Sequence, residues 1–132
     1  MRVFAILSFC IAAASVSAQS SKDPVITPSA VHALLGKDTT HVYLDVRTPA
    51  EFDGPSGHVP GSFLIPVQEL EARLGELKKY KGKTIIAICR SGNRSGYATA
   101  MLREHGFTAL NMVGGMIRWN AEGLPAQHTE KK

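Results

Sequence analysis

The fold of this chain is decided by the stretch Thr84-Ile85-Ile86-Ala87-Ile88-Cys89-Arg90-Ser91-Gly92-Asn93-Arg94-Ser95 and the residues that follow it to Leu102. Residues 85–88 form an apolar run rich in β-branched side chains, which predicts a buried strand. Residues 95–102 carry apolar side chains at helical spacing, which predicts a helix with Ser95 as its N-cap. A short polar loop joins the two elements, so a thiol stands at the carboxyl end of the predicted strand.

The loop has the features of an anion-binding site. A connection this short between a strand and a helix points backbone N–H groups inward at the N-terminus of the helix. Cys89 would have a lowered pKa there, because the thiolate is stabilised. Arg90 and Arg94 add positive charge for an anionic substrate, and Gly92 lets the backbone turn close to a ligand. A buried structural cysteine is the alternative, but the neighbouring Arg, Gly and Ser favour a reactive thiol.

Strands and helices alternate along the rest of the chain. Apolar runs predict further strands at residues 25–26, 41–46, 63–65 and 107–113. Helical signals follow each of them: Thr27 and Pro28 as a start, a capping box of Thr48 and Glu51, apolar spacing over residues 67–77, and a terminal helix from Met116. The alternation predicts the α/β class, with an open parallel sheet of about five strands and helices on both faces.

The first residues have the composition of an export signal. Arg2 precedes an apolar run over residues 3–16, and Val16-Ser17-Ala18 supplies small residues for cleavage, which predicts a signal peptide over residues 1–18. A membrane-spanning helix needs about 20 apolar residues, and this run is shorter. No stable membrane insertion is therefore expected after cleavage. We expect secretion across the inner membrane, into a bacterial periplasm. Cleavage would leave Cys89 as the sole cysteine, which excludes an internal disulfide.

The remaining length suits one domain, predicted over residues 25–125, with a disordered lead-in at 19–24 and a mobile tail at 126–132. The formal net charge is +4. The basic residues around residues 78–83 predict a solvated surface, and no nucleic-acid partner is expected. No metal-ligand cluster or nucleotide-binding motif occurs in the sequence, so neither a metal nor a cofactor is expected. We expect a monomer.

Residues 89–95, with the sequence CRSGNRS, resemble the active-site loop of the rhodanese (thiosulfate sulfurtransferase) family. Three further segments resemble family motifs in the family's order: Leu44-Asp45-Val46-Arg47, Gly57-His58-Val59-Pro60-Gly61-Ser62, and Gly114-Gly115-Met116 followed by Trp119. Together they cover most of the chain from about Val25 to Leu124. The resemblance implies a single-domain, rhodanese-like open sheet.

The resemblance implies that Cys89 is the catalytic residue and that the substrate-binding loop consists of Arg90, Ser91, Gly92, Asn93, Arg94 and Ser95. We expect Arg90 to point outward and recruit the anionic donor, and Arg94 to point back and hold the loop. Asp45 and Arg47 end a predicted strand, where ligands bind in open α/β sheets, and should support the site. We predict a structural salt bridge from Asp45 to Arg94, whereas Arg47 either forms such a pair or faces the substrate.

Two other conspicuous side chains have a structural interpretation. His58 is expected to pack and to form hydrogen bonds rather than to act as a base. Trp119 is expected to lie in the core.

The resemblance also implies a reaction. The Cys89 thiolate takes sulfur from thiosulfate or a similar donor and becomes a persulfide, and cyanide, a thiol or a protein acceptor then removes that sulfur. A non-catalytic persulfide carrier or binding module stays open as an alternative. A phosphatase or arsenate reductase with a related cysteine loop is less well supported, because those loops are one residue longer and many have His before the Cys. Here four residues separate Cys89 from Arg94, and Ile88 precedes the Cys.

Overall fold

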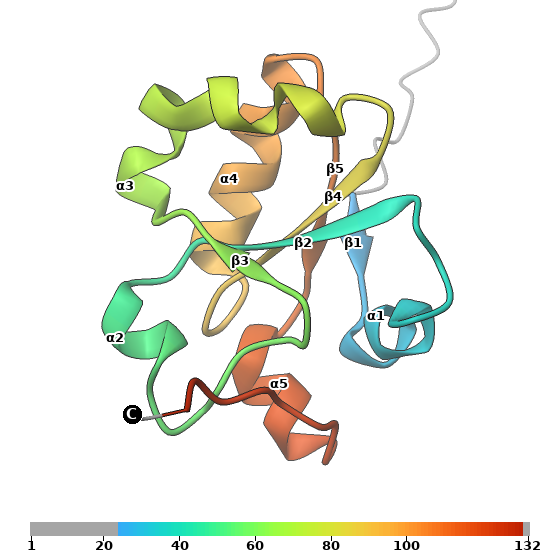
Figure 1. Cartoon of the computed structure of the whole chain (residues 1–132), viewed down its shortest axis with the longest axis vertical. Helices are drawn as coiled ribbons and strands as arrows, with labels where there is room; N and C mark the ends of the chain where they lie inside the picture. The colour runs from blue at the N-terminus through green and yellow to red at the C-terminus, as the bar shows by residue number, and fades with distance from the viewer. Residues whose placement is uncertain (1–23, 131–132) are drawn as a thin grey trace, which may run out of the picture.

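The computed structural model describes residues 24–130, and its centre is a parallel sheet with helices on both faces (Figure 1). The strands have the spatial order β1-β5-β4-β2-β3, and every neighbouring pair is parallel. This architecture confirms the predicted fold class. The strands are β1 (Val25–Ile26), β2 (His41–Asp45), β3 (Phe63–Leu64), β4 (Thr84–Ile88) and β5 (Thr108–Met112).

Helices fill the connections between the strands. They are α1 (Pro28–Leu34), α2 (Pro49–Phe52), α3 (Val67–Leu70), the 3₁₀ helix η1 (Glu71–Tyr80), α4 (Asn93–Glu104) and α5 (Gly115–Ala121). The predicted starts of α1 and α2 are confirmed, since Thr27 accepts a hydrogen bond from the N–H of Ala30 and Thr48 forms a capping box with Glu51.

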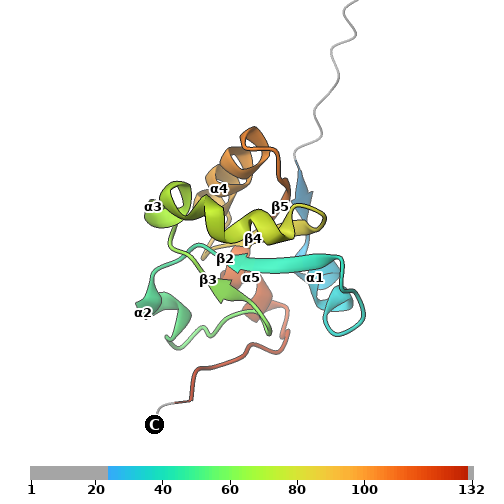
Figure 2. The ribbon, with the colours of Figure 1, turned by 45° about the horizontal axis from the view of Figure 1, so that its top comes forward.

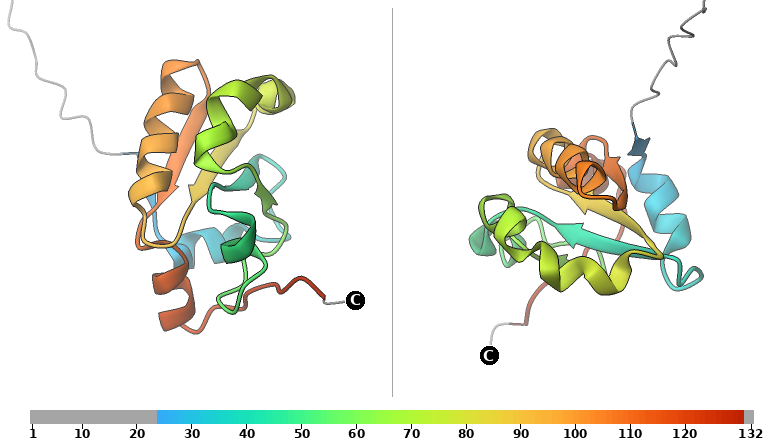
Figure 3. Two further views of the ribbon diagram at one scale, coloured as in Figure 1. Left: turned by 90° about the vertical axis from the view of Figure 1, so that its left-hand side faces the viewer. Right: turned by 90° about the horizontal axis from the view of Figure 1, so that it is seen from above.

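The two faces of the sheet carry separate apolar clusters. One cluster joins Leu44 and Ile85 to Leu70 of α3, Leu77 of η1 and Leu102 of α4. The other joins the opposite sides of the strands to α1 and α5, and includes Val31, Tyr43, Ile86, Met116 and Trp119. The views from two further directions show η1 on one side of the sheet and α5 on the other (Figure 2, Figure 3). Strand β4 is covered on both faces, so its carboxyl end is fixed by the core.

Three local predictions need correction. The helix expected over residues 67–77 is one α-helical turn followed by the 3₁₀ helix η1, within which Gly75 lowers the helix propensity. Ser95 does not cap α4, because that helix already begins at Asn93 with Gly92 as its N-cap. Among residues 95–102, Tyr97 does not belong to the buried apolar face that predicts this helix, because its side chain is 64% exposed.

The predictions for the two ends of the chain have different outcomes. The predicted signal peptide and all of the lead-in except Pro24 lie outside the described residues and stay predictions. The segment from residue 126 was expected to be a mobile tail, but Gln127 exchanges two backbone hydrogen bonds with His58, at 2.8 and 2.9 Å. Within residues 24–130, no helix is both long and apolar enough to cross a membrane.

The N-terminus of α5 holds the loop that follows β4. The N–H groups of Met116 and Ile117 donate to the carbonyl oxygens of Cys89 and Arg90, at 2.9 and 3.0 Å. This approach needs glycine at position 115, where φ is +54° and an added Cβ would lie 2.4 Å from the Arg90 carbonyl oxygen. The carbonyl groups of Cys89 and Arg90 are thereby turned toward α5.

Replacing Gly115 with alanine should therefore destabilise the protein beyond the cost of a positive φ alone. Gly123→Ala is a matched control, because Gly123 has φ +69° but nothing within 4 Å of an added Cβ. We expect Gly123→Ala to cost about 1–2 kcal/mol and Gly115→Ala to cost at least about 2 kcal/mol more, as measured by urea unfolding. Equal losses in the two variants would show that the close approach is not a constraint.

Candidate active site

Cys89 lies at the carboxyl end of the central strand, directly before the turn into α4. Its side chain is 1% exposed. Two donors point at its sulfur: the backbone N–H of Gly92 lies 3.0 Å from Sγ and the hydroxyl of Ser95 lies 3.2 Å from it. Gly92 has φ +102°, a conformation that turns its N–H back toward the thiol. The loop thus surrounds one sulfur atom with hydrogen-bond donors.

These donors decide the ionisation of the thiol. Burial by itself raises the pKa of Cys89, since it removes water from the thiolate. Hydrogen bonds from the Ser95 hydroxyl and from the backbone of Ser95, Gly92 and Ser91 act in the opposite direction and outweigh burial, so the pKa is lowered. The geometry therefore favours a nucleophilic thiolate. No histidine within residues 24–130 hydrogen-bonds to this sulfur.

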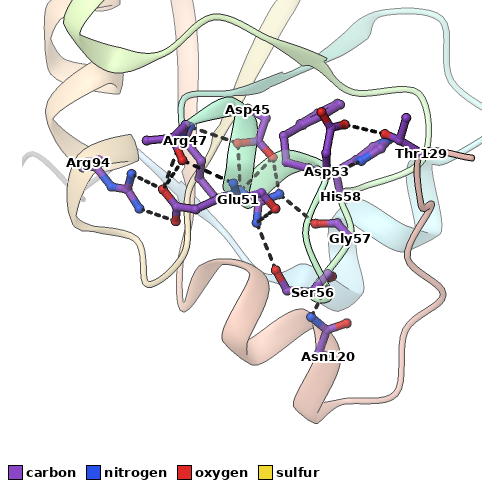
Figure 4. A network of polar contacts seen from close by, with 12 residues as sticks. Asp45, Arg47, Glu51, Asp53, Ser56, Gly57, His58, Arg94, Asn120 and Thr129 are labelled. Carbon is purple, nitrogen blue, oxygen red and sulfur yellow. Dashed lines mark hydrogen bonds and ion pairs between the residues drawn. The ribbon is translucent and has the colours of Figure 1, made fainter. Parts of the chain in front are cut away.

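A buried ion pair lies at the end of the neighbouring strand. The register of β2 against β4 places Asp45 opposite Ile88, one residue before the thiol. Asp45 pairs with Arg47 through Nη2–Oδ2 at 2.8 Å and Nε–Oδ1 at 3.0 Å, and both side chains are at most 1% exposed (Figure 4). The predicted salt bridge from Asp45 to Arg94 is therefore wrong.

The five N–H groups of the Arg47 guanidinium have partners inside the protein. Besides Asp45, they donate to the carbonyl oxygens of Glu51 and Gly57 and to the hydroxyl of Ser56. Of the two roles left open by the sequence, the geometry favours structural pairing, because no N–H remains for a substrate. Arg47 ties α2 and the turn at Ser56 and Gly57 to the end of β2.

Arg94 pairs with a residue whose contact the sequence did not reveal. Its guanidinium donates two hydrogen bonds to the Glu51 carboxylate, at 2.7 and 2.8 Å, and thereby links α4 to α2 (Figure 4). Hydrogen bonding to Arg94 holds the pKa of Glu51 at about 2, so the pair stays ionised at neutral pH. The side chains are 34% and 27% exposed. Arg94 therefore connects the start of α4 to α2 through Glu51, and its role in holding the loop stays a prediction.

The other loop residues form the mouth of the site. Arg90, Ser91 and Asn93 are exposed. A hollow of about 500 Å³ opens beside the loop, and it is lined by Val67, Gln68, Glu71, Asn93, Arg94, Tyr97 and Met101. No group of three acidic, His or Cys side chains among residues 24–130 could hold a metal ion.

The sequence analysis missed Asn111, which lies in β5 and contacts the loop from behind. Its side chain bonds both to Ser95 and to the carbonyl oxygen of Gly92. The available signal was a polar residue in the middle of the apolar run from Ala109 to Val113.

His58 and Trp119 have structural roles, as predicted. The His58 ring stacks on Phe52 with 3.7 Å between ring centroids, and its Nδ1 lies 3.0 Å from the Phe52 carbonyl oxygen. Trp119 is fully buried.

The two ion pairs should differ in their contribution to stability. Arg47→Met leaves Asp45 buried without its charged partner and should cost about 3–5 kcal/mol of unfolding free energy. Arg94→Met is the matched control, since it breaks a part-exposed pair and should cost at most about 1 kcal/mol. Urea unfolding of both variants measures the difference. A small loss in Arg47→Met would contradict the assigned structural role.

The Ser95 hydroxyl should contribute to thiol ionisation. Ser95→Ala removes one donor to the thiolate but leaves the burial of Cys89, so the pKa of Cys89 should rise by about one unit. The pH dependence of alkylation by iodoacetamide measures this pKa, because only the thiolate reacts. Ser91→Ala, at an exposed position whose backbone is kept, serves as the control. An unchanged midpoint in Ser95→Ala would exclude the hydroxyl as a stabilising donor.

Comparison with known proteins gives the relationship of the chain. The sequence profile of the rhodanese-like domain matches residues 27–122. A sulfurtransferase of Allochromatium vinosum is 39% identical over 90 residues, which cover 67% of this chain and 80% of that protein. A putative sulfur carrier protein of Bacillus subtilis is 34% identical over 107 residues, covering 80% of this chain and 56% of that protein.

A solved structure agrees with these matches. The thiosulfate sulfurtransferase of Pseudomonas aeruginosa superimposes with a TM-score of 0.72 at 27% identity, over 83% of this chain and 21% of that one. The chain spans 62% and 30% of the length of two other curated relatives, so it corresponds to one part of those proteins. The profile match, the sequence relatives and the shared fold establish that the chain belongs to the rhodanese-like domain family.

Proposed function

We propose that the protein is a sulfurtransferase that moves sulfane sulfur from thiosulfate or a similar donor to a thiophilic acceptor through a persulfide on Cys89. The observation that carries this proposal is the buried Cys89 sulfur, which accepts hydrogen bonds from the N–H of Gly92 and the hydroxyl of Ser95. Such a thiol is ionised without a separate base, because its own loop stabilises the negative charge. The sulfurtransferase relatives support the same class of reaction.

The first half of the reaction forms the persulfide. The Cys89 thiolate attacks the outer sulfur of thiosulfate, the sulfur–sulfur bond of the donor breaks, and sulfite leaves with the bonding electron pair. One thiolate and one thiosulfate dianion thus give one persulfide anion and one sulfite dianion. Arg90, exposed at the mouth, attracts the anionic donor.

The negative charge then lies on the terminal sulfur of the persulfide. The N-terminal N–H groups of α4 and the loop are the donors available to stabilise it. They are already oriented, because α5 holds the loop carbonyls on the other side. Cyanide or a thiol removes the terminal sulfur and regenerates the thiolate, which completes a ping-pong cycle.

A persulfide carrier is the second candidate, and the relationship to a putative sulfur carrier protein favours it. In that case Cys89 would hold the same persulfide but release it only to a protein partner. The two functions share a site and differ in the acceptor, so an assay with small acceptors separates them.

A phosphatase or arsenate reductase is disfavoured by geometry. Bidentate recognition of an oxyanion needs a guanidinium with free N–H groups. The Glu51 carboxylate occupies one N–H of each terminal nitrogen of Arg94, and its negative charge would repel a phosphate or arsenate bound beside it.

The deciding experiment measures thiocyanate formation from thiosulfate and cyanide with the purified protein and with Cys89→Ser. We expect turnover in the parent and loss to background in the variant, because the hydroxyl of serine cannot carry the sulfur. Mass spectrometry of parent protein incubated with thiosulfate alone should show the addition of one sulfur atom.

Three outcomes discriminate the candidates. A persulfide without thiocyanate turnover would favour the carrier. Equal background in parent and variant, with no added sulfur, would overturn the proposal for thiosulfate. Hydrolysis of a phosphate ester by the parent would favour the phosphatase alternative.

A further inference from the structure

The hydroxyl of Ser95 has two acceptors. Its Oγ lies 3.2 Å from Cys89 Sγ and 2.6 Å from Oδ1 of Asn111. The orientation of the Asn111 amide is fixed at its other end, where Nδ2 donates to the carbonyl oxygen of Gly92 at 3.0 Å. The reversed amide would place two oxygen acceptors against each other there, so Oδ1 must face Ser95.

A hydroxyl carries one hydrogen and can donate it to only one of these acceptors at full strength. We propose that Asn111 is a positioning residue that competes with Cys89 Sγ for the hydrogen of Ser95, so that the direction of the hydroxyl changes with the chemical state of the sulfur.

The preferred direction of the Ser95 O–H bond depends on whether Cys89 is a thiolate or a neutral thiol. When Cys89 is a thiolate, the hydrogen turns to the charged sulfur, because hydrogen bonds to ionised acceptors are the stronger ones. Oδ1 of Asn111 then faces the Ser95 oxygen without a hydrogen between them. When Cys89 is a neutral thiol, the hydrogen turns to Asn111, and the thiol can donate to Ser95. Asn111 therefore favours the neutral sulfur over the thiolate.

The same argument extends to the persulfide and there rests on the proposed function. In a persulfide the negative charge moves to the terminal sulfur, and Sγ becomes a weakly accepting, neutral bridging atom. The Ser95 hydrogen can then return to Asn111 without loss. Asn111 should therefore shift the equilibrium from thiolate plus thiosulfate toward persulfide plus sulfite.

Charged groups around the site also act on Cys89 and must stay constant in a test. Among the described residues near the loop, the charged ones are Asp45 at the end of β2, Arg47 after it, Glu51 in α2, Glu71 in η1, Arg90 in the loop, Arg94 in α4 and Arg118 in α5. Further along α3, η1 and α4 are Glu69, Arg73, Glu76, Lys78, Lys79, Arg103 and Glu104. Of these, Arg94 interacts with the Cys89 charge. Replacing Asn111 with an apolar residue changes none of them.

The test measures the pKa of Cys89 in Asn111→Leu, a substitution of similar size. The ultraviolet absorbance of the thiolate is recorded as a function of pH. Because the competing acceptor is removed, the pKa of Cys89 should fall by about one unit. Damage to the loop would raise the pKa toward that of free cysteine, which is the opposite direction. Asn111→Val, which suits a strand, gives a second reading if the leucine variant does not fold.

Two controls complete the experiment. In a Ser95→Ala background, Asn111→Leu should leave the pKa unchanged, because no hydrogen remains to be shared. Asn120→Leu removes an exposed asparagine whose Nδ2 donates to Ser56, and it should also leave the pKa unchanged. A rise or no change in both Asn111 variants, or a fall that persists without Ser95, would overturn the inference.

The persulfide arm is measured separately at a fixed ratio of thiosulfate to sulfite. Mass spectrometry should find several-fold less persulfide in Asn111→Leu than in the parent. An equal or larger persulfide fraction would overturn this arm. Absence of persulfide in the parent would reject the proposed function, whereas the pKa result needs no sulfur donor and stands apart from it.

Discussion

The site depends on how α5 holds the loop after β4. A loop that surrounds a sulfur atom with N–H groups must turn its carbonyls elsewhere, and buried carbonyls need donors. The first N–H groups of α5 supply them to Cys89 and Arg90. Gly115 permits this contact, and Trp119, further along α5, anchors the helix in the core. The geometry around the thiol is therefore determined partly by residues more than twenty positions away.

The two ion pairs near the loop differ in burial, and the buried pair is the more rigid contact. Asp45 and Arg47 are enclosed, and every donor of the guanidinium is engaged, so the pair fixes the end of β2 and the turns around it. Glu51 and Arg94 are part-exposed and connect α2 to α4. Water and salt weaken this second pair more than the first. The mouth of the site is thus more adaptable than its floor.

Much of this arrangement can be predicted from the sequence. The remaining contacts could not be predicted, for physical reasons. Apolar runs and caps such as Thr48 with Glu51 locate the elements, because these signals are local. The predicted partner of Arg94 was wrong because Asp45 and Glu51 both lie near the same strand end. Only the packing of α2 determines which of the two carboxylates Arg94 contacts. The role of Asn111 was missed because it depends on how β5 packs against the start of α4. Ser95 was interpreted as an N-cap, although its hydroxyl bonds inward to Cys89 and Asn111.

If Cys89 carries sulfur as proposed, its site faces a constraint that an ordinary nucleophile does not. A thiolate stabilised too strongly would be an unreactive acceptor of sulfur, since nucleophilicity falls as the pKa falls. One stabilised too weakly would be protonated and inert. The proposed sharing of the Ser95 hydrogen between Cys89 and Asn111 would answer both requirements, because that hydrogen would support the thiolate only while the charge is on Sγ. In the proposed persulfide, where the charge would lie on a terminal sulfur, the same hydrogen would have another acceptor 2.6 Å from its oxygen, and the backbone N–H groups would be left to stabilise the new charge.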